Sequence, residues 1–456
     1  MSGWLRGPHE AVALAFDGDV VRMGELADAV AAVDLPGDGP IGCPAGMPPA
    51  ALITTVLAAL ERGRPVLVGG DDDDASNIAR DLPAGAELVL LTSGSSGPRS
   101  TPRAVARTEH SWLASAAPLA QIVGLEAADR VAVTGPLHVS MHLYAALHAL
   151  WAGASVGDRV ADATVVHATP TRLARLLDGP LTARTVVVAG AVLDDSLRER
   201  AGRRLRLVEY YGAAELSFVA AGGPDGLTAF PGVELDLRPV AAGLELWARS
   251  PYLALGTTGG GMLRRDAAGF ATVGDLVEPT HDGAFTVLGR GDSAITTAGA
   301  TVIAERVERV LETLPGVASA AVVGEPHALL GERVVAVVEL ERPESAGGAP
   351  GDATSDATAP VDAAATATAL AAAARRHLDA AELPRRWIFR PLPRTASGKV
   401  ARGRVRAAVV AGDFGEAQAR TAADDAAAEH VAAEHVADED AAAEFAAGHH
   451  TESEQA

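Results

Sequence analysis

Strand-like and helix-like segments alternate between residues 128 and 215, and no other feature constrains the fold of this chain as strongly. Strands are predicted over 130–134, 163–168, 184–189 and 205–210, and helices over 140–151, 170–177 and 194–201. Such alternation is typical of parallel strands whose connecting helices cover the faces of a sheet. Ligands of these sheets bind at the carboxyl ends of the strands, so we expect a binding site along that edge.

The segments on either side show different patterns. Residues 1–90 contain a helix-like run at 50–61 and a strand-like run at 65–68, and the acidic run 71–74 is expected to be a solvated turn. Between 227 and 288, short strands separated by glycine and proline turns predict an antiparallel sheet or a barrel. A compact C-terminal unit is predicted from a helix at 305–314 and strands at 318–324 and 332–339, and ordered structure is expected to resume at 370–378.

The predicted fold class is therefore α/β, and a chain of 456 residues is long enough for more than one domain. A large N-terminal domain (residues 1–290) is expected to hold parallel α/β sheets plus a small antiparallel barrel-like region, followed by a small α+β domain (291–411). Residues 342–368 are a low-complexity insertion that lacks core-forming residues. Residues 412–456 form an acidic, alanine-rich tail that we expect to be disordered.

Charge and cysteine content exclude several classes of protein. The net charge of −21 argues against a nucleic-acid partner, although the tail from Gly412 onward carries twelve of the acidic residues. No apolar run is long enough for a membrane span, and the N-terminus lacks a secretory pattern. The single cysteine, Cys43, excludes an internal disulfide framework and favours a reducing, cytoplasmic location.

A loop rich in glycine and serine, TSGSSG from Thr92 to Gly97, connects two strand-like flanks and is a candidate phosphate site. Its backbone N–H groups and hydroxyls could line a concave anion site. It is not the P-loop of nucleoside triphosphatases, because Arg99 and Ser100 stand where that pattern requires glycine and lysine. Arg99, Arg103 and Arg107 follow, and any of them could neutralise a polyphosphate. A plain turn is the alternative.

Four further motifs follow this loop. They are YYGAAE at 210–215, VGD at 273–275, GRGD at 289–292 and LPRTASGKV at 392–400. In this order and at these separations, the five motifs resemble those of the adenylate-forming superfamily, which includes acyl-CoA synthetases, adenylation domains of peptide synthetases and luciferases. The resemblance runs from about residue 88 to 404 and is greatest to short members such as the o-succinylbenzoate–CoA ligases.

The resemblance implies a reaction in two halves. A carboxylate attacks the α-phosphate of ATP to give acyl-AMP and pyrophosphate, and the thiol of coenzyme A then displaces AMP. The small C-terminal domain would be mobile and would pivot at Asp292, bringing Lys399 to the first half and the region of Gly299 to the second. The protein would then be an AMP-forming acid–thiol ligase that uses ATP, Mg²⁺ and coenzyme A and acts on a small carboxylic acid.

The resemblance also assigns the nucleotide contacts. The phosphate loop would consist of Thr92, Ser93, Gly94, Ser95, Ser96 and Gly97. Arg103 would take the place of the usual lysine after this loop, with Arg99 as the competing choice. The adenine and ribose contacts would come from Gly190, Ala191, Tyr211, Gly212, Asp275 and Arg290. Among these, Tyr211 would stack on the base and Asp275 would accept hydrogen bonds from the ribose hydroxyls.

Three residues would serve the chemistry itself. Glu215 would bind Mg²⁺, for which one protein carboxylate beside the phosphates is enough. His138 would lie near the acyl group. Lys399 would be the catalytic lysine, and it is the only lysine in a chain with 38 lysine and arginine residues. An ordinary surface cation would be arginine in this chain, whereas a compact ammonium suits the space between the carboxylate and the α-phosphate.

Other interpretations stay open at this point. Tyr211 could be a core residue, Glu215 a surface acid, Asp275 a turn former and His138 a loop histidine. Ala214, Thr296 and Ala304 replace residues that are usual in the superfamily, and the phosphate loop comes early in the chain. The acyl group could pass to a separate carrier protein in place of coenzyme A. The chain could also be a degenerate, non-catalytic protein that binds nucleotide or acyl-AMP.

Overall fold

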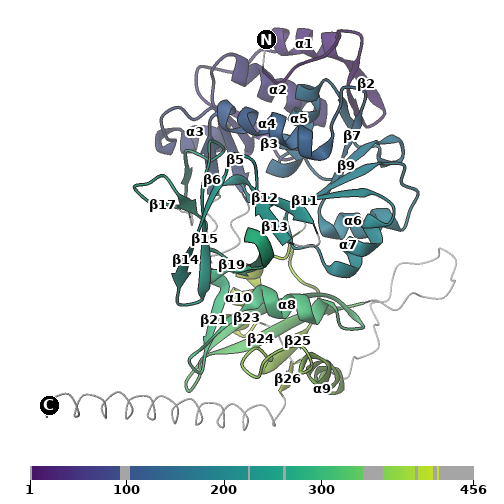
Figure 1. Ribbon diagram of the computed structural model, residues 1–456. Helices are drawn as coiled ribbons and strands as arrows, with labels where there is room; N and C mark the ends of the chain where they lie inside the picture. The colour runs from purple at the N-terminus through teal and green to yellow at the C-terminus, as the bar shows by residue number, and fades with distance from the viewer. Residues whose placement is uncertain are drawn as a thin grey trace, which may run out of the picture. The chain divides into compact units, whose positions relative to one another are not determined.

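A computed structural model of the chain describes residues 3–92, 103–223, 226–259, 263–341, 363–395, 399–413 and 418–420 (Figure 1). The fold consists of two compact units that divide between Val287 and Leu288. Each unit has hydrophobic clusters of its own. The predicted fold class, a mixed α/β architecture with a smaller α+β part, is confirmed.

The predicted alternation of strands and helices forms a parallel layer in the larger unit. Its parallel strands are β1 (Val12–Phe16), β8 (Ser155–Gly157), β7 (Arg130–Val133), β9 (Val165–Ala168), β10 (Thr185–Val188) and β11 (Arg206–Ala213), in that spatial order. All four residues of β10 are buried, as expected of a strand covered on both faces. The strand β2 (Asp19–Arg22) pairs antiparallel at the edge.

The helices of this unit begin and end at residues suited to those positions. They are α1 (Met23–Ala32), α2 (Pro49–Glu61), α4 (Glu109–Val123), α5 (Ser140–Ala152), α6 (Pro170–Leu177) and α7 (Asp195–Gly202). The side chains of Thr108 and Asp194 accept hydrogen bonds at the starts of α4 and α7. Gly124 and Gly153 end α4 and α5 with φ of 68° and 80°, a conformation that glycine adopts without strain.

A second sheet of the larger unit holds the strands on either side of the predicted phosphate loop. Its order is β16 (Gly256–Thr258), β6 (Arg103–Arg107), β5 (Leu88–Thr92), β4 (Val66–Gly69) and β3 (Ile41–Pro44). Because β5 and β6 are antiparallel, Thr92 pairs with Arg103. The two ends of the segment that connects these strands therefore lie side by side.

The prediction that the acidic run 71–74 is a solvated turn was wrong. The run begins helix α3 (Asp72–Ile78), and the 3-10 turn Ala79–Asp81 follows that helix. The side chain of Asp71 accepts a hydrogen bond from the backbone N–H of Asp74, and carboxylates are favoured in the first turn of a helix. Asp72 also accepts a 2.7 Å bond from the N–H of Gly42. A Cβ at Gly42 would overlap the backbone of Asp71 and Asp72, so α3 packs directly on β3.

The short strands after β11 are antiparallel, as predicted, and extend the same sheet. They are β12 (Ser217–Gly223), β13 (Gly226–Ala229), β14 (Glu234–Val240), β15 (Gly243–Arg249), β17 (Arg264–Arg265), β18 (Ala271–Thr272), β19 (Asp275–Pro279) and β20 (Phe285–Arg290). A 3-10 turn, His281–Gly283, precedes β20. The strand β11 is parallel to β10 on one side and antiparallel to β12 on the other.

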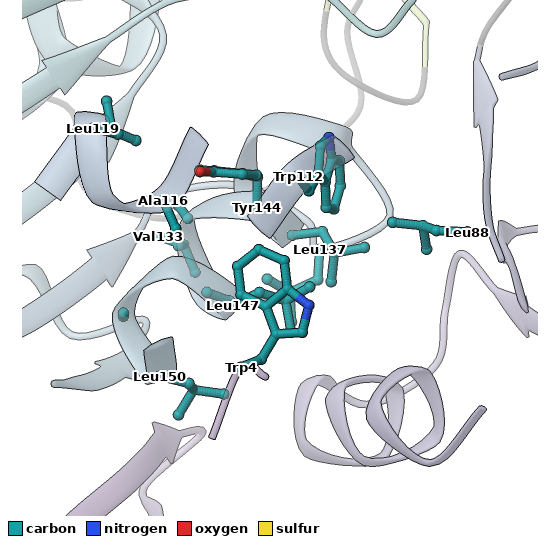
Figure 2. Close-up of a cluster of buried hydrophobic side chains, with 14 of the residues drawn as sticks. Trp4, Leu88, Trp112, Ala116, Leu119, Val133, Leu137, Tyr144, Leu147 and Leu150 are labelled. Carbon is teal, nitrogen blue, oxygen red and sulfur yellow. The ribbon is translucent and has the colours of Figure 1, made fainter. Parts of the chain in front are cut away.

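Aromatic side chains form much of the core beside α4 and α5 (Figure 2). Trp4, which is 1% exposed, and Trp112 both meet the ring of Tyr144 edge-on, with centroids 6.1 and 5.3 Å apart. The Tyr144 hydroxyl lies 2.8 Å from Ser115 Oγ, so its polar end is satisfied within the core. The N-terminal segment thus packs against the helices of the parallel layer.

The smaller unit consists of an antiparallel sheet with helices. Its strands are β21 (Ala294–Thr297), β22 (Ala300–Ile303), β23 (Val317–His327), β24 (Gly331–Leu340), β25 (Arg386–Phe389) and β26 (Gln418–Arg420), and its helices are α8 (Ala304–Glu312), α9 (Ala363–Ala374) and α10 (Arg402–Ala411). The exception to antiparallel pairing is β25, which lies parallel to β24. A 3-10 turn, Gly291–Ser293, precedes β21.

Two boundaries of this unit differ from the prediction. Helix α9 begins at Ala363, inside the segment 342–368 that was expected to lack core residues, and Ala367 in it is fully buried. Alanine is the best helix former, so a run of alanines can supply a tightly packed helix without large side chains. The strand β26 lies in the predicted disordered tail and pairs with β25, whose edge offers free backbone partners. No helix in the described ranges is long and apolar enough to cross a membrane.

Candidate active site

The carboxyl ends of β10 and β11 carry the turn and the aromatic motif predicted to contact adenine. Gly190, just after β10, has φ of 90°, and Ala191 beside it is exposed. Tyr211 and Gly212 lie near the end of β11, where the pairing with β12 is irregular. A Cβ at Gly212 would overlap the carbonyl oxygen of Ser217, so only glycine allows the two strands this close an approach.

Tyr211 and Asp275 are in direct contact although 64 positions separate them in the sequence. The hydroxyl of Tyr211 donates a hydrogen bond to the Asp275 carboxylate. Asp275 is 7% exposed and is the first residue of β19, so it does not serve as a turn former. The ring of Tyr211 meets Phe285 edge-on with centroids 6.3 Å apart, which leaves the ring partly exposed. The structure thus brings the predicted base and ribose contacts together.

Glu215 is a buried acid and not the surface acid of the alternative interpretation. It lies in the turn after β11 and is 8% exposed. Its carboxylate has no hydrogen bond or ion pair with any residue that the structure describes, while its backbone oxygen accepts a 2.9 Å bond from Ala254. The nearby charge of Arg107 interacts with this carboxylate without a direct ion pair, so the oxygens of Glu215 are available to bind a cation. No cluster of three metal-binding side chains exists within the described ranges. One protein carboxylate beside substrate phosphates is enough to bind Mg²⁺.

Arg107 supports the segment that carries Glu215, a role that sequence reasoning missed. The side chain is fully buried, although it was expected to be available to a polyphosphate. Its guanidinium donates to the backbone oxygen of Ala214, to that of Tyr252 at 3.4 Å and to Ser111 Oγ at 3.2 Å. Burial lowers the pKa of Arg107 to about 9, and the negative charge of Glu215 opposes that shift. The only sequence signal was an arginine at the end of an otherwise apolar strand.

The predicted phosphate loop falls on an undescribed part of the chain. Ser93, Gly94, Ser95, Ser96 and Gly97 lie outside the described residues, as does the competing Arg99. The backbone of Thr92 ends β5, and Arg103 begins β6 opposite it. These pairings confirm the strand-like flanks, and the role of the loop stays a prediction.

His138, which is half-buried, precedes α5 and lies near the buried imidazoles of His142 in α5 and His167 on β9. Neither ring nitrogen of His138 has a hydrogen-bond partner among the residues described, and the same holds for Nδ1 of His142 and of His167. His142 and His167 are 2% and 3% exposed. Burial lowers the pKa of His142 to about 4 and that of His167 to about 3, so both rings are neutral near pH 7. We call His138, His142 and His167 the imidazole cluster.

The remaining predicted residues belong to the smaller unit. Arg290 ends β20, and Asp292 lies in the 3-10 turn that follows. Gly299 forms the exposed turn between β21 and β22 with φ of 80°. Lys399 is exposed on a short hairpin in which Arg394 pairs with Val400. The backbone oxygen of Lys399 accepts a 2.7 Å bond from the N–H of Thr395.

Comparisons with known proteins agree with this architecture. Residues 306–399 match the AMP-binding enzyme C-terminal domain family. A probable 2-succinylbenzoate–CoA ligase of Mycobacterium tuberculosis is 28% identical over 82% of this chain and 98% of its own length. An uncharacterized acyl–CoA ligase of Bacillus subtilis is also 28% identical, over 69% of this chain and 67% of its own length.

A solved structure extends the similarity to the whole fold. The o-succinylbenzoate CoA synthetase of Bacillus subtilis, in complex with its acyl-adenylate intermediate, superposes with a TM-score of 0.72 at 19% identity. The superposition covers 89% of this chain and 98% of that one. The matched C-terminal domain, these acyl–CoA ligase relatives and the shared fold together support a place for the chain in the adenylate-forming superfamily of AMP-binding enzymes.

Proposed function

We propose that this protein is an AMP-forming acyl-CoA synthetase. It would convert a carboxylic acid and ATP into acyl-AMP and pyrophosphate, and then acyl-AMP and coenzyme A into a thioester and AMP. The observation that carries the proposal is the edge formed by the ends of β10 and β11 and the start of β19. There the buried Glu215, whose carboxylate has no hydrogen-bond or ion-pair partner among the described residues, lies four residues after Tyr211, which is bonded to Asp275.

Each of these groups has a task in the first half-reaction. The ring of Tyr211 stacks on adenine, and the Asp275 carboxylate accepts hydrogen bonds from the ribose hydroxyls. Glu215 holds Mg²⁺, which when bound neutralises charge on the phosphates. A carboxylate oxygen then forms a bond to the α-phosphorus while the bond from that phosphorus to the bridging oxygen breaks and pyrophosphate leaves. The Lys399 ammonium stabilises the charge that develops at this centre.

The test is exchange of labelled pyrophosphate into ATP with a panel of acids. Acid-dependent exchange is the expected result, whereas a non-catalytic binder of nucleotide would show none with any acid. Since several nitrogens of the imidazole cluster have no hydrogen-bond partner among the described residues, the panel pairs each simple acid with an analogue that bears a second carboxylate, ketone or hydroxyl. We expect the analogues with the second polar group to exchange faster.

The acceptor of the acyl group is tested separately. Purified acyl-AMP is supplied with either coenzyme A or a carrier protein, and we expect thioester formation with coenzyme A. Transfer to the carrier alone would favour the alternative acceptor.

The single cysteine, Cys43, is buried, and burial raises the pKa of its thiol to about 12, so it is unreactive. A single cysteine forms no internal disulfide, which fits a reducing compartment such as the cytoplasm.

Replacing Asp275 by asparagine is expected to weaken nucleotide binding. The change removes the charge that accepts the ribose hydrogen bonds, and charged hydrogen bonds contribute about 1.5–3 kcal/mol, so the KM for ATP should rise by about 10- to 100-fold. Initial rates over a range of ATP concentrations measure the change. Asp282→Asn is the control, since Asp282 is exposed in the same region at φ of 56°, where asparagine is tolerated. An unchanged KM for ATP in Asp275→Asn would exclude the ribose contact.

A further inference from the structure

Arg402 connects the lysine hairpin to helix α8. It is the first residue of α10 and follows Lys399 by three positions. Its Nη1 donates to Glu305 Oε1 at 2.6 Å, and its Nη2 and Nε donate to the two carboxylate oxygens of Glu308 at 2.6 and 3.1 Å. Two nitrogens of the guanidinium bond to one carboxylate and the third nitrogen bonds to another carboxylate. This geometry holds the guanidinium in one orientation. The chain just after Lys399 is therefore anchored to α8.

Glu305 extends this anchor to the segment before β21. Its Oε1 lies 2.7 Å from the hydroxyl of Ser293, which is 2.9 Å from the backbone oxygen of Arg290. Gly289 has φ of 152°, and a Cβ there would overlap the carboxylate of Glu305. The backbone of 289–293, where the pivot is predicted, thus lies directly against Glu305. We call Arg402, Glu305, Glu308 and Ser293 the anchor network.

The side chains of the anchor network are partly buried, so their charges depend on hydrogen bonds and ion pairs within the protein. Glu308 also accepts a 2.7 Å bond from the N–H of Val322 on β23, so its carboxylate is held from two sides. Burial raises the pKa of Glu308 to about 7, and the charge of Arg402 opposes this shift. Without Arg402, two carboxylates one helical turn apart would face each other without their shared cation. Loss of Arg402 should therefore shift the start of α10, and the lysine hairpin with it.

We propose that Arg402 is a positioning residue for acyl-AMP formation, holding the Lys399 hairpin in a defined position relative to the segment 289–293. This inference rests on the proposed function. Within the described part of the chain, the side chain of Arg402 bonds to Glu305 and Glu308 and not to the β21–β22 turn that carries Gly299. The half-reaction assigned to Gly299 should therefore not require Arg402. The expected signature is a loss confined to the first half-reaction.

The experiment compares Arg402→Gln with Arg406→Gln in the full chain. Arg406 lies one turn further along α10 and bonds to Glu332 at 2.9 Å, but it is outside the anchor network and more than half exposed. Two rates are measured for each variant: acid-dependent pyrophosphate exchange, and thioester formation from supplied acyl-AMP and coenzyme A. We expect Arg402→Gln to lower exchange by about tenfold or more, because small misplacements of catalytic groups are costly. Its thioester rate should stay within about twofold, as should both rates of Arg406→Gln.

Equal losses of both rates in Arg402→Gln, or no loss of exchange, would overturn the inference. If Arg402→Gln does not fold, Ser293→Ala is measured instead, since it removes one hydroxyl and leaves the ion pairs intact. A lower exchange rate with an unchanged thioester rate is again the expected result, and unchanged exchange contradicts the inference. A wild-type protein without exchange for any acid would reject the proposed function itself, whereas an active wild type with an equally active Arg402→Gln rejects only this inference.

Discussion

Replacing Lys399 by alanine is expected to lower the rate of acyl-AMP formation by about 10²- to 10³-fold, the typical loss when one donor to a developing charge is removed. The side chain is exposed in the smaller unit, so the substitution should leave the melting temperature unchanged. Pyrophosphate exchange measures the effect. Thioester formation from supplied acyl-AMP serves as the internal control, because the proposed role of Lys399 is confined to the first half-reaction.

A second substitution at this position tests the shape of the group. Lys399→Arg keeps the positive charge but replaces a compact ammonium with a broad, planar guanidinium. We expect it to remain nearly as inactive as the alanine variant. Full activity of Lys399→Arg would show that charge alone matters, and full activity of Lys399→Ala would remove the lysine from the mechanism.

Replacing Arg107 by methionine should have the largest effect on stability. The side chain is fully buried, and its removal leaves the backbone oxygens of Ala214 and Tyr252 without donors and Glu215 without its neighbouring positive charge. Each buried acceptor left without its donor costs about 1–3 kcal/mol of unfolding free energy. Urea unfolding of the larger unit, followed by tryptophan fluorescence, measures the loss, since Trp112 lies beside the guanidinium with its ring centre 5.2 Å away.

The matched control for Arg107 is Arg203→Met. Arg203 pairs with Glu199 on the surface of α7, where both side chains are about 70% exposed, and such pairs contribute little. We expect its midpoint in urea to stay close to that of the wild type. If Arg107→Met unfolds at the same urea concentration as Arg203→Met, then Arg107 does not support the segment that carries Glu215.

Local patterns predicted the elements of the parallel layer well. Valine-rich runs such as 185–188 can only be strands covered on both faces, and proline or an acidic cap marks the starts of α6 and α7. The motif order was likewise enough to place the chain in its superfamily. The predictions of strands and helices depend on neighbours within a few positions, which a single sequence records directly.

Local sequence patterns did not predict the contacts between segments that are distant in the sequence. Nothing near Tyr211 indicates that its hydroxyl bonds to Asp275, and nothing near Arg107 indicates that it meets the oxygen of Ala214. The strand β26 was missed for a related reason, because its partner β25 lies about thirty residues earlier and only the sheet edge there gives residues 418–420 a place. Tertiary context decides in such cases, and local propensity does not.

The mixed pairing of β11 has a consequence for how this protein can change over evolution. Its register is set twice, by β10 along one edge and by β12 along the other. A single inserted or deleted residue would turn every side chain of the strand to the opposite face and break two ladders together. We therefore expect residues 210–215 to tolerate substitutions better than changes in length, which surface connections absorb more easily.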